Sequence, residues 1–283
     1  MPQARGLRFR DWKTHCVVFG DGEVPGRLPL LCLHGGPGGT HLPLEGLGQL
    51  SEQGRRVVYY DQLGSGDSDR PDDPSLWTVE TYVEQLRSVR DGLGLDEVHL
   101  FGTSWGGMLA LEYAFTEPPG LKSLILNSTP TSAPRWAEEG HRLLATLPAG
   151  LDEKQAEEEF KRRYICRLDP EPEVLARARA KFGTEVYEAM WGPNEFTATG
   201  TLKDWDVIGR LGGIDVPTLI TSGRHDECTP KLVEPLHEGI SGSEWVLFEE
   251  SAHMPYLEEP ERFLEVVGGF LDRVEGLRPP PPG

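Results

Sequence analysis

Ser104 lies in a short motif whose residue types suit nucleophilic chemistry. The motif, at 102–106, reads glycine, threonine, serine, tryptophan, glycine. Apolar, β-prone residues precede it at 98–101 and helix-favouring residues follow it from Met108. A strand, a tight turn and a helix in this order predict a nucleophile elbow, with glycine where a side chain would collide with backbone. The alternative is an ordinary strand-to-helix turn, because the motif also arises by chance.

A serine hydroxyl becomes a nucleophile when a histidine, held by a buried carboxylate, accepts its proton. Two polar loops downstream supply these groups, Asp226 in one and His253 in the other, each after an apolar strand-like stretch. The order serine, acid, histidine is the order that this kind of elbow requires. His225 competes with His253 as the base, but it precedes the acid on the same loop and breaks that order. We therefore predict a catalytic triad of Ser104, Asp226 and His253.

The acyl-transfer intermediate carries a negative oxygen that needs backbone N–H donors. The apolar run 28–33 ends in His-Gly-Gly-Pro-Gly at 34–38. A phosphate-binding loop is the alternative, but no Gly-Lys-Ser/Thr follows. We predict an oxyanion hole formed by the N–H groups of Gly36 and Trp105. The predicted reaction proceeds through an acyl-enzyme and needs no metal or cofactor. The four cysteines match no zinc spacing and are expected to be buried thiols: Cys16, Cys32, Cys166 and Cys228.

The elements that must position these groups alternate between strand and helix. Strand-like stretches occupy 28–33, 57–60, 98–101, 121–126, 216–221 and 245–248. Helix-like stretches occupy 42–53, 78–92, the segment after the elbow, 229–239 and 261–271. This alternation predicts an α/β fold with a mostly parallel sheet and helices on both faces. Residues 7–20 are expected to add an edge hairpin arm, and Asp61 is expected to brace two loops of the site rather than to react.

Residues 134–190 break this alternation because they are charged and helix-favouring. We predict a core of residues 1–127 and 210–283, with a helical cap of residues 128–209 inserted over the active site. The basic stretches 161–163 and 177–181 are expected to be solvated helix faces. The proline-rich tail at 278–283 is expected to stay mobile.

The chain is strongly acidic. Its 283 residues carry a net charge of −18, which argues against partners such as nucleic acid or an anionic membrane. The N-terminus lacks the apolar run of a signal peptide, and no stretch approaches the ~18 apolar residues of a membrane helix. We therefore expect a cytoplasmic protein. The oligomeric state stays open.

Several motifs together resemble the prolyl aminopeptidases, also called proline iminopeptidases, and within them the branch of the tricorn-interacting aminopeptidases. They are HGGPG at 34–38, DQLGSGDSD at 61–69, GTSWGG at 102–107, GPNEFTATGTLKDWD at 192–206, GRHDECTP at 223–230 and SAHMPYLEEPERF at 251–263. The resemblance covers essentially the whole chain. It implies an α/β-hydrolase fold with a helical cap, and removal of an N-terminal residue, often proline, from short peptides.

The resemblance also implies that Glu195 and Glu227 bind the free amino terminus of the substrate. The match is looser in the cap, where Trp191 replaces an expected smaller polar residue. Trp105, Trp191 and Phe196 are expected either to line the pocket or to form cap core.

Two other functions stay open: an amino-acid amide hydrolase or esterase with the same triad, and a ligand receptor that turns over slowly. Activity on a simple amide rather than on di- and tripeptides would identify the first function. Acylation of the protein without turnover would identify the second. For the aminopeptidase and for the amide hydrolase alike, the expected substrate is a small peptide or aminoacyl amide with a free amino terminus.

Overall fold

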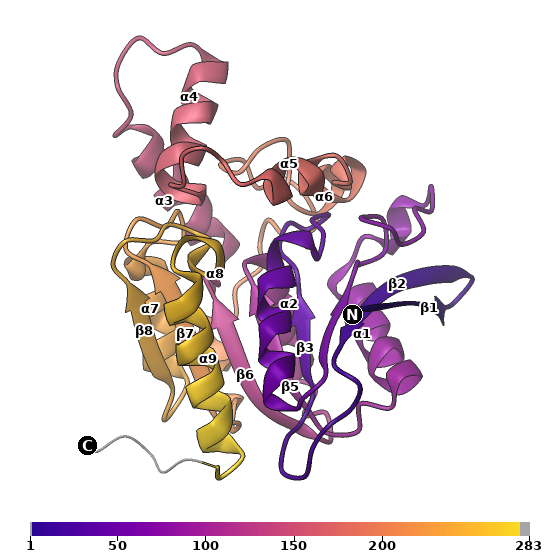
Figure 1. Cartoon of the computed structure of the whole chain (residues 1–283). Helices are drawn as coiled ribbons and strands as arrows, with labels where there is room; N and C mark the ends of the chain where they lie inside the picture. The colour runs from indigo at the N-terminus through magenta and orange to yellow at the C-terminus, as the bar shows by residue number, and fades with distance from the viewer. Residues whose placement is uncertain (1, 278–283) are drawn as a thin grey trace.

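The computed structural model describes residues 2–277, so the predicted mobile tail lies outside the described residues. Its centre is an eight-stranded sheet with the order β1-β2-β4-β3-β5-β6-β7-β8 (Figure 1). In chain order the strands are β1 (Gln3–Phe9), β2 (Trp12–Phe19), β3 (Leu30–Leu33), β4 (Val57–Tyr60), β5 (Val98–Thr103), β6 (Leu121–Asn127), β7 (Thr218–Gly223) and β8 (Glu244–Phe248).

The sheet is parallel from β4 to β8, as the sequence predicts. Strands β3, β4, β5 and β7 are buried at every residue, which matches strands covered on both faces. The predicted edge arm is present as the antiparallel pair β1 and β2, with β2 antiparallel to β4. Its turn lies at Arg10-Asp11, inside the predicted stretch.

Helices cover both faces of the sheet. One face carries α1 (Val79–Leu93), α2 (Trp105–Ala114) and α7 (Pro230–Gly239). The other carries the 3-10 helix η1 (Leu42–Gln53) and α9 (Pro260–Val274), which runs along the near side of the sheet in Figure 1. Leu31 and Leu33 of β3 belong to the first cluster and Leu30 and Cys32 to the second, because successive side chains of a strand point to opposite faces.

The sequence predicts Thr78 as the N-cap of the helix at 78–92, and Thr229 as the N-cap and Pro230 as the first residue of the helix at 229–239. The structure confirms these signals except the Thr229 cap. Thr78 Oγ1 accepts a hydrogen bond from the N–H of Thr81 and caps α1, and Gly94 ends that helix in a left-handed conformation. α7 begins at Pro230, as predicted. Thr229 does not cap α7 with its side chain, however, because its hydroxyl donates to Glu139 Oε1 at 3.0 Å.

The segment between β6 and β7 is helical; its helices up to residue 190 lie beyond the carboxyl ends of the strands (Figure 1), while residues 208–213 pack against α7. It contains α3 (Ala133–Leu144), α4 (Glu153–Phe160), the π-helix η3 (Lys161–Ile165), α5 (Glu173–Arg179), α6 (Thr184–Met190) and the 3-10 helix η4 (Ile208–Gly213). Its two ends meet, since Val207 N donates to Thr131 O and Ala133 N to Trp205 O. This pairing lies close to the predicted cap boundaries at 128 and 209.

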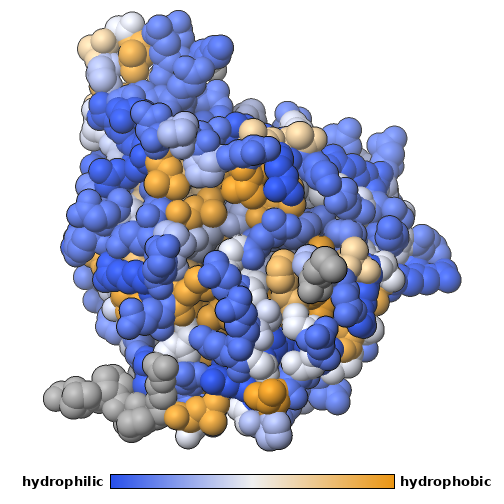
Figure 2. Space-filling view, viewed as in Figure 1, coloured by the Kyte–Doolittle hydropathy of each residue, from blue (hydrophilic) through white to orange (hydrophobic). Residues whose placement is uncertain are grey.

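The remaining differences from the predicted elements are small. β7 begins two residues later than expected, α9 continues to Val274, and the short helices η2 (Pro74–Leu76) and α8 (Pro255–Glu258) are additional. The four cysteines are free and buried, as expected. The face in Figure 2 is largely hydrophilic, with separate apolar areas. None of the helices in the described part of the chain has the length and apolar character needed to span a bilayer.

Candidate active site

Ser104 occupies the sharp turn between β5 and α2. Its backbone has φ 53° and ψ −123°, a strained conformation for a residue other than glycine. A Cβ atom at position 102 would lie 2.3 Å from Gly106 O, and one at position 106 would lie 2.2 Å from Leu33 O. The two glycines are therefore required by close packing, as the sequence pattern predicts.

His253 and Asp226 form a buried hydrogen-bonded pair. His253 Nδ1 lies 2.7 Å from Asp226 Oδ1, which also accepts the backbone N–H of Cys228 at 2.7 Å. Asp226 follows β7, and His253 follows β8, so neighbouring strands deliver both side chains to one edge of the sheet. Asp226 Oδ2 is buried and has no hydrogen-bond partner within residues 2–277.

Ser104 and His253 both reach the end of β6. Ser104 N donates to Asn127 O at 3.0 Å, and the Ser128 hydroxyl donates to His253 O at 3.2 Å. The Ser104 hydroxyl makes no hydrogen bond with the described residues, so the structure does not join it to His253. Such bonds are often long before substrate binds. The structure thus brings Asp226 and His253 together and leaves the serine contact open.

Carboxylates dominate the electrostatics around His253. Burial lowers its pKa, but the Asp226 carboxylate outweighs this effect, and Glu195 and Glu258 act in the same direction, so the pKa is raised above the ordinary value. Glu258 also positions the loop, because its Oε2 accepts the N–H groups of Ala252 and Met254 on either side of His253. Sequence reasoning did not single out Glu258, which ends the short helix α8 that follows His253.

Glu195 and Glu227, which the resemblance pointed to, lie in the same buried region. Burial raises the pKa of both carboxyls, and for Glu227 the charges of Glu195 and Asp226 add to the effect. Glu227 Oε1 lies 3.9 Å from His253 Nε2. No lysine or arginine among the described residues forms an ion pair with either glutamate. Within the described residues His253 is the only ion-pair partner of either carboxyl, so the pair can bind a further cation.

Tyr187 on α6 is a site residue that sequence reasoning missed. Its hydroxyl lies beside the Glu195 carboxyl, and that oxygen is buried without a hydrogen-bond partner in the described residues. No local signal distinguishes Tyr187, because its role depends on how the inserted helices fold back. A polar group that is buried and unsatisfied in this way calls for a partner.

Aromatic residues hold Glu195 in place. The indole N–H groups of Trp136 and Trp191 both donate to Glu195 O at 3.3 Å, and the two rings meet edge to face. Phe196 packs edge to face on Phe160 with ring centroids 4.6 Å apart. Trp191 and Phe196 therefore pack within the insertion, while Trp105 is buried in the core and contacts a different loop.

Asp61 braces two loops, as expected. Its Oδ1 accepts the backbone N–H of His41 and contacts His41 Nδ1 at 2.8 Å, while Oδ2 accepts the N–H of Asp67. His15, Asp61 and Asp67 are the only residues in the described ranges with the spacing of metal ligands. Asp67 is already paired with Lys181, so this cluster is a hydrogen-bonded brace.

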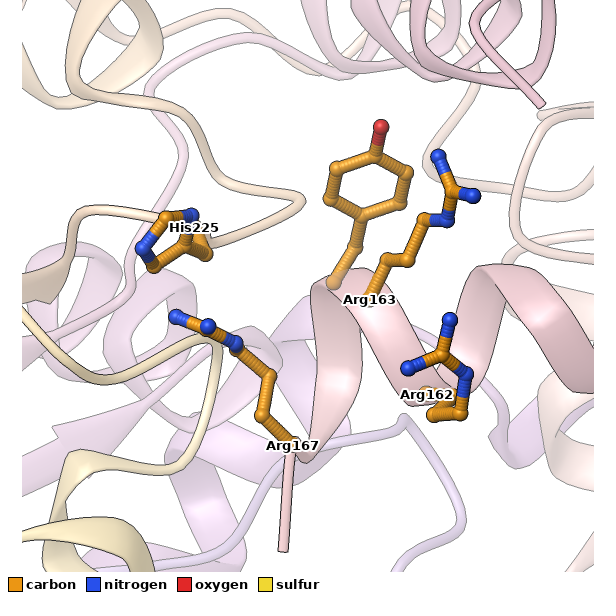
Figure 3. Close-up of a pocket in the computed structure, with 5 residues that line it drawn as sticks. Arg162, Arg163, Arg167 and His225 are labelled. Carbon is orange, nitrogen blue, oxygen red and sulfur yellow. The ribbon is translucent and has the colours of Figure 1, made fainter.

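A basic pocket of about 400 Å³ lies on the other side of the Asp226 loop. It is lined by Arg162, Arg163, Tyr164, Arg167 and His225, and Arg167 extends toward His225 (Figure 3). Burial and Arg167 lower the pKa of the His225 imidazole. The alternative base is therefore exposed in this pocket, without a hydrogen bond to Asp226. The arginines at 162 and 163 share Glu159 as a partner, which fits the predicted solvated helix face.

Comparison with known proteins identifies the family. The family model of the alpha/beta hydrolase fold matches residues 29–260. The chain is 41% identical to proline iminopeptidase from Clostridium botulinum, covering 94% of this chain and 97% of that protein, and 41% identical to the one from Heyndrickxia coagulans, covering 89% and 93%. The crystal structure of proline iminopeptidase from Mycobacterium smegmatis superposes with a TM-score of 0.91 at 37% identity, covering 96% of this chain and 99% of that one. The chain belongs to the proline iminopeptidase family of α/β hydrolases.

Proposed function

We propose that this protein is a serine aminopeptidase that releases N-terminal residues, proline among them, from short peptides. The observation that carries the proposal is the pair of half-buried Glu195 and buried Glu227 beside His253, which has no lysine or arginine partner among the described residues. Burying two carboxylates is costly unless a cation joins them. The ammonium of a free peptide amino terminus supplies that cation at the distance of one residue from the scissile carbonyl.

The pair suits N-terminal proline in a specific way. A protonated proline nitrogen is a secondary ammonium with two N–H donors, and two carboxylates can accept one each. A primary ammonium has a third N–H, for which the unpartnered Tyr187 hydroxyl lies nearby. The site therefore supports binding of both, with the surrounding insertion setting the preference for the side chain.

The proposed reaction follows from the triad. Ser104 attacks the carbonyl carbon of the first residue while His253 accepts the hydroxyl proton and Asp226 stabilises the imidazolium. The N–H groups of Gly36 and Trp105 hold the oxyanion. His253 then protonates the leaving amine, and water releases the acyl group from the serine. In this scheme residues 128–209 act as a cap that closes the amino-terminal side of the site.

Four free buried thiols support a reducing compartment such as the cytoplasm.

A paired kinetic assay tests the proposal. Prolyl, alanyl and leucyl arylamides are each compared with their N-acetylated forms. Because an acetylated nitrogen carries no charge, we expect acetylation to abolish cleavage of the best substrate. Cleavage of blocked substrates or plain esters at similar rates would refute the aminopeptidase and leave the alternative, a general esterase or amidase with the same triad. Prolinamide compared with proline dipeptides separates an amino-acid amide hydrolase from a peptidase.

A further inference from the structure

Gln62 is a fully buried amide that the proposed mechanism does not use. It directly follows Asp61 at the end of β4 and is 1% exposed. It makes hydrogen bonds to both segments that carry the proposed oxyanion donors. A buried amide in a well-packed interior is retained only where its donors and its acceptor are satisfied.

On one side Gln62 contacts the residue after the nucleophile. The Trp105 indole Nε1 donates to Gln62 Oε1 at 2.7 Å. An indole nitrogen can only donate, so this bond settles which end of the amide is the oxygen. Trp105 is 1% exposed and packs edge to face on Tyr82, so the indole has no freedom to compensate for a lost partner.

On the other side Gln62 holds the segment that leads into the glycine loop. Gln62 Nε2 donates to His34 O at 3.0 Å, and Gln62 N donates to His34 Nε2 at 2.9 Å. Burial lowers the pKa of the His34 imidazole to about 4, so the ring is neutral, and its Nδ1 donates to Gly35 O at 2.9 Å. The loop then passes directly over the nucleophile, since a Cβ at Gly35 would lie 3.2 Å from Ser104 Cβ.

We propose that Gln62 is a positioning residue that sets the separation of the two oxyanion donors, the N–H groups of Gly36 and Trp105. The inference rests on the proposed oxyanion hole. The bridge needs one side chain that accepts from an indole and donates to a carbonyl at the same moment. Glutamine does both, whereas glutamate lacks the N–H donor, methionine lacks both groups and asparagine is one methylene shorter.

The test is a double-mutant cycle of Gln62→Met and Trp105→Phe with prolyl arylamide. We expect each single variant to lower kcat about 10- to 100-fold with KM changed less than about threefold, because displacing an oxyanion donor acts on the transition state. Both changes break one bridge, so the double variant should lose little more than the worse single variant. Pyrrolidine-2-boronic acid mimics the tetrahedral intermediate, so its affinity for each variant should fall in proportion to kcat/KM. The affinity for proline, which does not use the oxyanion hole in this way, should not fall.

Gln85→Met is the matched control. Gln85 is also fully buried and holds the loop after β4 through Leu63 N and Thr14 Oγ1, but it does not touch His34 or Trp105. Equal kinetic losses in Gln62→Met and Gln85→Met, or losses that multiply in the double variant, would overturn the proposal. If Gln62→Met does not fold, Trp105→Phe alone decides, since it leaves the backbone N–H in place. If the wild-type enzyme prefers esters, the same double-mutant cycle is measured with the ester as substrate. The role of Gln62 can therefore be tested even if the proposed aminopeptidase activity is refuted.

Discussion

The core loops and the inserted helices are built in different ways. The loop after β7, with Asp226, and the loop after β8, with His253, are tied to each other through backbone bonds from Arg224 N to Phe248 O and from His225 N to Ser251 O. The loop after β7 extends a strand that is buried at every residue, whereas most of β8 is half-buried. In the insertion η3 has no buried residue and α5 has one, and many side-chain contacts are exposed ion pairs such as Lys161–Glu157. In the proposed mechanism the elements tied to the sheet therefore carry the groups for bond breaking, and the more exposed insertion carries the selectivity.

The two regions are joined by backbone and side-chain hydrogen bonds at specific points. Glu227 N donates to Tyr164 O and His253 N donates to Ile165 O, both at 3.1 Å, and Gly183 N donates to Gly38 O at 2.7 Å. The proposed recognition of the amino terminus is split across this junction, because Glu227 belongs to the core and Glu195 to the insertion. We therefore predict that substitutions in the core lower turnover, whereas substitutions at the junction alter the choice of substrate.

The largest effect is expected for Ser104→Ala. Removing the nucleophile should lower kcat by about 10⁴- to 10⁶-fold on prolyl arylamide, because no other group can form the acyl-enzyme. The measurement is steady-state kinetics together with a thermal melt. A melting temperature within a few degrees of wild type is the control. Residual activity above a hundredth of wild type would remove Ser104 from its role.

The next effect is expected for Glu227→Gln and Glu195→Gln. Each should lower kcat/KM for free-amino substrates by about 10- to 100-fold, since a hydrogen bond to a charged group contributes ~1.5–3 kcal/mol. Because acetylated substrates do not use the carboxylates, the ratio of free to acetylated substrate should fall by the same factor. An unchanged ratio would show that the amino terminus binds elsewhere. Recognition of the amino terminus would then not be divided between the core and the insertion.

The pH dependence of the kinetics should separate the two regions, with a smaller effect. The rate should fall about tenfold for each pH unit below the pKa of His253. His253 must be neutral to accept the proton, and its pKa is raised by Asp226 in spite of burial. Activity should therefore fall as pH drops through a value above that of an ordinary histidine. Protonation of Glu195 and Glu227, whose pKa values burial raises, should appear as a rise in KM in the same direction. In Glu227→Gln the acidic limb of kcat should persist, and its disappearance would contradict this division.

The smallest effect is expected for Arg162→Gln in the exposed ion-pair network. Arg162 shares Glu159 with a second arginine, and exposed pairs contribute ~0–1 kcal/mol. We expect kcat and KM within twofold of wild type and a melting temperature lowered by no more than a few degrees. A tenfold change in KM would instead link the basic pocket to substrate binding.

Much of the fold could be predicted from local signals. The run at 28–33, the elbow and the Thr78 cap rest on neighbours in the chain, so spacing alone was sufficient to place them. The choice of His253 over His225 rested on chain order, and the structure pairs His253 with Asp226. Thr229 shows the limit of such signals, because its hydroxyl turns away from α7 to meet Glu139 from another element. The same limit applies to the hairpin turn at Arg10-Asp11, which carries no glycine.

The sequence by itself determined the order of strands and helices, the strained serine turn and the loops in which the acid and the base lie. These depend on periodicity and on glycine positions, which act over a few residues. Only the tertiary structure decided that the Tyr187 hydroxyl lies beside Glu195 and that Gln62 joins His34 to Trp105. Each of these contacts joins residues separated by other elements in the chain, so it arises only when the sheet and the inserted helices pack together.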